Sequence, residues 1–200
     1  MKIEVKIEGI KEIQEKLKPE KIQKAIIRSL DRAAKAGRQE ALNRIRERYN
    51  IKESDLRREI ITDIHPSKLE ATITAKGRPV SIFLFRPKQI IEAIHGKSKG
   101  LYSKLVKARA GQRAKGVTVE IIKGQRKLVK GGFIQRLKTG HVAIFKREGK
   151  ARLPIKKLST IGTPSMFGRI SIFDKVVTRV KEVWQKNIKH ELEEGWKHQK

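Results

Sequence analysis

The sequence has no cysteine among its 200 residues and few aromatic side chains. The first absence excludes disulfide bonds, thiol catalysis and zinc sites built on cysteine. Hydrophobic residues make up 38% of the chain and aromatic ones 5%, which allows a core of modest size. The longest strongly apolar run, Ile82 to Phe85, is far too short to cross a bilayer. The N-terminus alternates charged and apolar residues without the apolar stretch of a signal peptide, so we expect a soluble protein.

Acidic residues are scarce in the middle of the chain. Between Ala93 and Arg147 there are fifteen lysines and arginines but a single carboxylate, Glu120. Residues 61–160 carry a net charge of +19, which is about two thirds of the total of +28. Because like charges on a folded domain repel one another, this density predicts contact with a polyanion or with a partner surface of opposite sign.

Residues 96–116 differ in kind from the rest of the chain, because they hold four glycines, seven basic residues and no acid. We predict a flexible basic loop there. The candidate contacts with DNA or an acidic partner are Lys97, Lys99, Lys104, Lys107, Arg109, Arg113 and Lys115. The same composition also fits a mobile, solvated loop whose charge serves solubility. Tyr102 is the one aromatic residue in the segment, which disfavours base stacking, so any DNA contact would be to the backbone.

Residues suited to catalysis or metal binding do not cluster along the chain. The five histidines show neither HxH nor HExxH spacing. Carboxylates of the middle region, such as Asp63 and Glu120, are scattered, whereas a two-metal nuclease needs several that converge. The sequence also has no glycine-rich phosphate loop. We therefore expect a protein that is not an enzyme and that has no metal and no cofactor.

Two long helices are predicted, one near each end of the chain. From Glu20 to Tyr49, small and apolar residues recur at spacings of three and four and form one helical face. The members of this face are Ile22, Ile26, Leu30, Ala33, Gly37, Ala41 and Ile45. The small residues in its middle permit another backbone to approach closely. A second stripe runs from Ile172 to Leu192, and its last turns are candidates for contact with a neighbouring subunit.

Strands and turns occupy the region between the two helices. The predicted strands are residues 2–8, 69–75, 80–85, 117–122, 128–129, 133–137, 141–145 and an edge strand within 152–158. We expect residues 69–75 and 80–85 to pair with each other, and two hairpins, one of 117–122 with 128–129 and one of 133–137 with 141–145. Residues 56–61 are expected to form a short helix capped by Ser54 or Asp55. The predicted fold class is α+β, with long N-terminal and C-terminal helices packed on a mostly antiparallel β-sheet and a basic flexible loop. A single domain over residues 1–200 is expected.

Residues 130–155 combine strands and turns in a specific order. A Phe-Ile strand is followed by a glycine turn, a strand that ends in Arg-x-Gly, and an Arg-x-Pro-Ile strand. This pattern resembles the signature of the tailed-phage minor tail protein Z family. The residues that carry it are Phe133, Ile134, Gly140, Arg147, Gly149, Arg152, Pro154 and Ile155. The order of the flanking segments agrees over nearly the whole chain, with departures in the N-terminal strand and in a helix rich in lysine and glutamate.

The resemblance implies a non-enzymatic role in tail completion and head–tail joining. It places the protein at the head-proximal end of the virion tail, and in the host cytoplasm during assembly. The implied partners are the tail terminator, head–tail connector proteins and further copies of the chain around the tail axis. The basic loop would then face the phage DNA end in the tail channel and contact its backbone. An alternative that depends on charge alone is a sequence-nonspecific nucleic-acid-binding protein.

Overall fold

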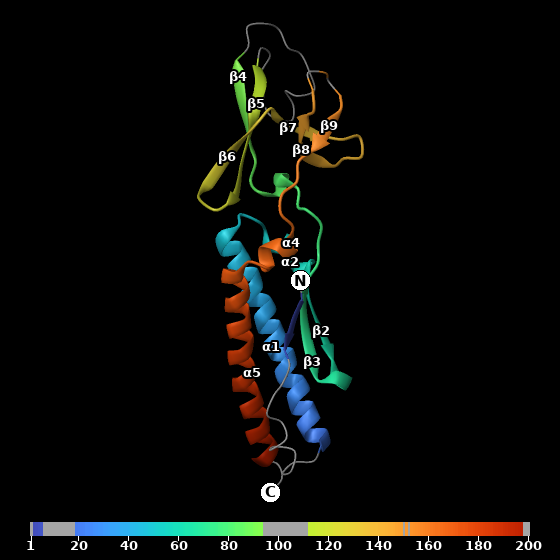
Figure 1. The fold of residues 1–200 in the computed structure, drawn as a ribbon, viewed down its shortest axis with the longest axis vertical. Coiled ribbons are helices and arrows are strands. Elements are labelled where there is room, and N and C mark those ends of the chain that lie inside the picture. Colours follow the sequence, from blue (N-terminus) through green and yellow to red (C-terminus); the bar gives the residue numbers. More distant parts are fainter. Residues whose placement is uncertain (1, 6–18, 94–111, 150, 152, 198–200) are drawn as a thin grey trace. The chain divides into compact units, whose positions relative to one another are not determined.

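A computed structural model describes residues 2–5, 19–93, 112–149, 151 and 153–197 (Figure 1). The helices are α1 (Pro19–Arg48), α2 (Glu53–Arg57), α4 (Thr163–Phe167) and α5 (Ile170–Lys197), with 3-10 turns at Pro66–Lys68 and Ile82–Leu84. The strands are β1 (Lys2–Val5), β2 (Ile60–His65), β3 (Glu70–Ala75), β4 (Lys88–Ala93), β5 (Gln112–Ile122), β6 (Gln125–Lys130), β7 (Gly132–Arg136), β8 (Val142–Arg147) and β9 (Ile155–Lys157).

The strands form three sheets of three strands each, in the orders β1-β3-β2, β4-β5-β6 and β7-β8-β9. Every neighbouring pair in these sheets is antiparallel. The α+β class with two long helices and antiparallel sheet is therefore confirmed. No helix in the described ranges is long and apolar enough to cross a membrane.

Backbone contacts divide the chain into two compact units. The first, here called the helical unit, comprises residues 1–45, 53–77 and 163–200. The second, here called the basic unit, comprises residues 46–52 and 78–162. Each is described below by itself, and the single domain expected over residues 1–200 stays a prediction.

In the helical unit, α1 packs against α5 and against the sheet of β1, β2 and β3. All seven residues of the predicted α1 face are buried, which confirms the helix and the side that it turns to the core. Gly37 lies in the middle of this face, where a β-carbon would clash with Val180 of α5 and Ile73 of β3. The predicted close approach is therefore present, although side chains and not a backbone make it.

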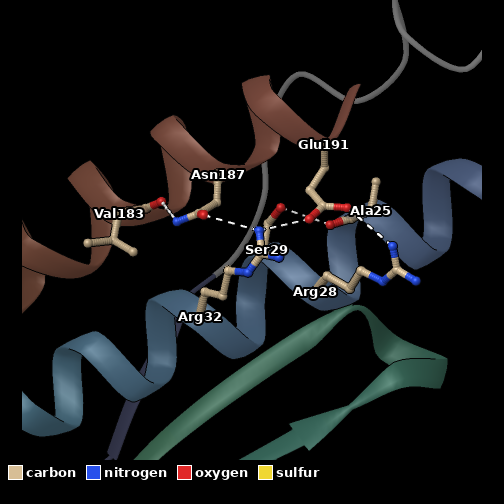
Figure 2. Close-up of polar contacts among 7 residues, drawn as sticks. All are labelled: Ala25, Arg28, Ser29, Arg32, Val183, Asn187 and Glu191. Atoms are coloured by element: carbon tan, nitrogen blue, oxygen red, sulfur yellow. Dashed lines mark hydrogen bonds and ion pairs between the residues drawn. The ribbon is translucent and has the colours of Figure 1, made fainter. Parts of the chain in front are cut away.

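The two long helices are joined by polar contacts as well as by the core (Figure 2). On α5 the last fully buried apolar residue is Val180 among those whose burial is described, and the stripe beyond it is half-buried. Glu191 lies on α5 beyond Val180 and forms ion pairs with Arg32 at 2.8 Å and with Arg28 at 3.5 Å. Asn187 accepts a hydrogen bond from Arg32 at 3.3 Å and donates one to the Val183 carbonyl at 2.6 Å. Ion pairs and a hydrogen bond thus join the C-terminal half of α5 to α1, beside its half-buried apolar stripe.

Two sequence predictions around the first sheet are wrong. Residues 80–85 do not pair with β3, whose partners are β1 and β2. Instead Ile82 and Phe85 are both buried across a 3-10 turn, while Leu84 is 39% exposed. A spacing of three brings two side chains to one side of such a turn, whereas a strand would alternate them. The predicted helix 56–61 also ends early, because α2 stops at Arg57 and Ile60 begins β2, where it pairs with Ala75.

In the basic unit, β4-β5-β6 packs on β7-β8-β9. The shared core contains Ile82, Val117, Val119 and Ile144. The Gln89 side chain joins the two sheets, since its amide nitrogen donates to the Gly116 carbonyl at 2.7 Å and its oxygen accepts from the Ile134 N–H at 3.2 Å. Both predicted hairpins, β5–β6 and β7–β8, are confirmed, and β9 is the predicted edge strand. Strand β4 and helix α4 were not predicted from the sequence.

Candidate polyanion and partner interface

Positive charge is concentrated in the basic unit. Its residues include 25 lysines and arginines but 4 carboxylates, for a net charge of +21. The helical unit has 24 basic and 17 acidic residues, for a net charge of +7. Three quarters of the total of +28 thus belong to the basic unit, which makes it the candidate surface for an anionic partner.

The signature residues Phe133, Arg147 and Ile155 are brought together on one face of β7-β8-β9. Phe133 pairs with Phe145 across the strands, with ring centroids 6.3 Å apart. The Arg147 guanidinium lies 5.1 Å from the centre of the Phe133 ring, a cation–π contact worth about 0.5–1 kcal/mol at an exposed site. Ile155 packs against the same cluster. These residues hold the sheet together, and their chemistry is that of packing.

The remaining signature residues shape the turns and the opposite face of this sheet. Ile134 packs against the shared core of the basic unit. Gly140 has a φ of 82°, which favours glycine, and its N–H donates to the Leu137 carbonyl at 2.9 Å. Near Gly149, the Glu148 N–H donates to the Pro154 carbonyl at 3.3 Å. Arg152 lies outside the described residues.

Two exposed lysines face each other on β8 and β9. Lys146 and Lys156 are directly opposite in the strand register, and both side chains are exposed. Like charges in this position destabilise a strand pair, and an anion between the two ammonium groups would remove the repulsion. Lysines on an edge strand such as β9 also oppose pairing with the strands of other chains. The pair could not be identified from the sequence, because it depends on the register between β8 and β9.

Glu120, the single carboxylate of the basic stretch, caps the β5–β6 turn. Its Oε1 accepts from the Gly124 N–H at 2.9 Å, and its Oε2 accepts from Arg126 Nη2 at 2.9 Å. The Gly124 hydrogen bond is the largest effect on the pKa of the Glu120 carboxyl and lowers it; desolvation, the next largest, opposes it, and Arg126 and Arg86 lower the pKa further. Glu120 therefore has a structural role that accounts for its position.

The carboxylates Asp63 and Glu120 belong to different units of the chain. Asp63, the other carboxylate considered as a catalytic candidate, is exposed on β2. Among the described residues there is no group of three or more histidines and carboxylates that could hold a metal ion.

Most of the predicted loop contacts lie outside the described residues: Lys97, Lys99, Lys104, Lys107 and Arg109. The loop predicted over 96–116 is too long at its end, because residues 112–116 belong to β5. Arg113 pairs with Glu92 in the β4–β5 register. Lys115 is exposed at a β-bulge, where β5 has one residue more than β4. The role of these seven basic residues stays a prediction.

A family model described as prophage minor tail protein Z (GPZ) matches residues 7–199. No curated protein and no solved structure matches the chain. The matched range includes all of the signature residues and both units, except residues 1–6, which contain β1, and residue 200.

Proposed function

The chain belongs to the prophage minor tail protein Z family and has a structural role in a phage tail, and from this premise we propose that it acts in tail completion and head–tail joining. In this proposal the basic unit faces the phage DNA end or an acidic surface of a neighbouring tail protein. The observation that carries the proposal is the segregation of charge, with +21 in the basic unit and +7 in the helical unit.

A net charge of this size suits contact with the DNA backbone. Double-stranded DNA presents one negative charge per ~1.7 Å of its axis, so each lysine or arginine that meets a phosphate releases a bound counterion. The basic residues on the strands include the opposed Lys146 and Lys156, whose repulsion a phosphate group would relieve. Such contacts recognise the backbone and do not read the bases. The role that we propose needs no catalysis.

We further propose a place and partners for the protein in the virion. It would lie at the head-proximal end of the tail, after assembly in the host cytoplasm, next to the tail terminator and the head–tail connector. Several copies would surround the tail axis as a closed ring, which is how identical head-to-tail interfaces avoid open filaments.

The proposal is tested by tail assembly with a loop variant in which Lys104, Lys107, Arg109 and Arg113 are all replaced by glutamine. A matched control replaces four exposed lysines of the helical unit, Lys21, Lys24, Lys175 and Lys186, with glutamine. We expect tails of the loop variant to form but to join heads or deliver DNA poorly, whereas the control behaves normally. If the loop variant joins heads and delivers DNA as the unchanged protein does, the proposed DNA contact is wrong.

The alternative is that the chain is a sequence-nonspecific nucleic-acid-binding protein. Binding measurements on the isolated protein distinguish this alternative from the proposed tail role. If all seven basic residues of 97–115 met phosphates, log K would fall with log salt at a slope of about −6. Tight binding with such a slope, together with normal head–tail joining by the loop variant, would favour the alternative.

A further inference from the structure

An apolar pocket lies on the β5–β6 hairpin of the basic unit, and a role in DNA contact alone does not account for it. The pocket has a volume of about 120 Å³ and is lined by Val119, Ile121, Ile122, Gln125 and Lys127. Val119 is 2% exposed and belongs to the shared core, whereas Ile121 and Ile122 are half-buried. The pocket therefore continues the core of the basic unit to its surface, and its walls are mostly carbon.

The shape of this pocket is fixed by hydrogen bonds on both sides of the hairpin. Residues 48–50 run alongside the end of β5, where the Asn50 N–H donates to the Ile121 carbonyl at 3.0 Å and the Lys123 N–H donates to the Arg48 carbonyl at 2.9 Å. The Glu120 carboxylate closes the turn on the other side through Gly124 and Arg126. A pocket that is already ordered loses little conformational freedom when it binds a ligand.

The surroundings of the pocket are positively charged. Lys127 lines it and is exposed, and Lys123 is exposed in the adjoining turn. Arg126 contributes less, because its charge is balanced by Glu120 at 2.9 Å. An apolar floor with lysines beside it is complementary to an apolar side chain that has carboxylates next to it. A DNA backbone supplies the negative charge but has no apolar side chain to fill such a pocket.

We propose that this hairpin pocket binds an apolar side chain from an acidic segment of a neighbouring protein. The inference rests on the proposed function, since it assigns a protein partner to part of the basic unit. It predicts two contributions to affinity, one from burial of the apolar side chain and one from the charge around it. Buried apolar anchors usually dominate the affinity of such interfaces, while surrounding charge sets the rate and specificity of association.

The test uses the full-length protein, labelled with ¹⁵N, and two capped peptides. Each peptide has a central residue flanked by pairs of glutamates, and that residue is leucine in one peptide and serine in the other. We expect the leucine peptide to bind at least about tenfold more tightly, because it buries its side chain. Its amide shift changes are expected at Val119, Ile121 and Ile122. Equal binding of the two peptides, or shift changes confined to other strands, would overturn the proposal.

Single variants distinguish the contribution of the apolar pocket to peptide binding from the contribution of the charge around it. Gln125→Trp places a bulky ring at the pocket and is expected to abolish the preference for leucine, whereas Gln125→Ala keeps it. Lys127→Glu is expected to weaken both peptides. The matched control Lys130→Glu makes the same charge change on β6 at an exposed residue that does not line the pocket, so it should weaken both peptides less than Lys127→Glu does. Spectra of the free variants verify that each is folded.

A short DNA duplex distinguishes this inference from the proposed function. If the two peptides bind alike and the duplex displaces both, the basic unit responds to charge alone and the pocket proposal is wrong, while DNA contact stands. If the leucine preference is present but tails of the Gln125→Trp variant still join heads normally, the pocket does not serve head–tail joining, and the assignment of its partner to the tail is wrong.

Discussion

Gly37 of α1 lies directly against Val180 of α5. A β-carbon at Gly37 would overlap the Val180 Cγ2 methyl group and approach Ile73 Cδ1 to 2.7 Å. Val180 is 1% exposed, and its branched side chain has little freedom to move away. The absence of a side chain at Gly37 therefore permits the helix packing of the helical unit.

The variant Gly37→Ala should lose stability, although alanine is the better helix former. Overpacking costs about 1–3 kcal/mol, and the gain in helix propensity is about 1 kcal/mol. We expect a net loss of up to about 2 kcal/mol in the free energy of unfolding, measured by urea denaturation with circular dichroism. Adding Val180→Ala should remove the overlap with Val180, although not the approach to Ile73, so the double variant should be more stable than the sum of the single changes predicts. Simple additivity would contradict this account.

The contact between Glu191 and Arg32 should stabilise the C-terminal half of α5 (Figure 2). The Glu191 side chain is 13% exposed, but Arg32 is 49% exposed, so solvent screens the pair. We expect Glu191→Gln to cost about 1 kcal/mol or less and to speed amide hydrogen exchange in this half of α5. Glu182→Gln is the control, because Glu182 is 60% exposed and its ion pair with Arg179 spans 3.6 Å. The two variants should become alike at high salt.

The Glu120 carboxyl should titrate below the ordinary glutamate value of 4.5, because its charged form accepts hydrogen bonds from Gly124 and Arg126. A lowered pKa in the folded protein means that the stabilisation is complete above the ordinary value and is lost as pH falls through the lower folded value. An NMR titration should show the Gly124 amide shift changing in this acidic range, and Glu120→Gln should remove the change. A Glu120 pKa at or above 4.5 would contradict the capping role.

Because Lys146 and Lys156 repel each other, a change that removes the repulsion should stabilise the protein and weaken its binding to DNA. Lys156→Glu replaces a repulsion by an attraction and should stabilise the protein by about 0.2–1 kcal/mol in low salt. It should also weaken binding to a DNA duplex and make the slope of log K against log salt shallower by about 1 if Lys156 contacts a phosphate. Lys21→Glu, on the exposed side of α1, makes the same change in net charge. If both variants bind DNA equally, net charge and not this pair governs affinity.

Elements defined by local patterns could be predicted from the sequence. The spacing of apolar residues along α1 and α5 identified both helices and the side of α1 that is buried, because helical periodicity is local. The two hairpins were also predictable, since the glycine turns at Gly124 and Gly140 have positive φ and join adjacent strands. The signature residues in β7, β8 and β9 identified the family for the same reason, because their pattern is continuous in the sequence.

Pairing between distant segments could not be predicted in this way. Residues 80–85 are apolar and follow β3 closely, which suggested a hairpin, yet Ile82 and Phe85 are buried together in the basic unit. There the Ile82 N–H donates to the Leu158 carbonyl at 3.3 Å and the Thr160 N–H to the Val80 carbonyl at 2.8 Å. No local pattern connects segments more than seventy residues apart, because their pairing depends on which surfaces are left to be covered.

The sequence by itself determined the two long helices, the two hairpins, the family and the excess of positive charge, since each follows from residue type and short-range spacing. The tertiary structure alone decided which segments share that charge in one unit and which groups lie beside it. Contacts join residues 46–52 to 78–162 in one unit of net charge +21. Strand register opposes Lys146 to Lys156. Packing of β5 and β6 leaves an apolar pocket beside Lys127. The first of these features joins segments that are distant in the chain. The other two depend on strand register and side-chain packing, which composition and periodicity do not specify.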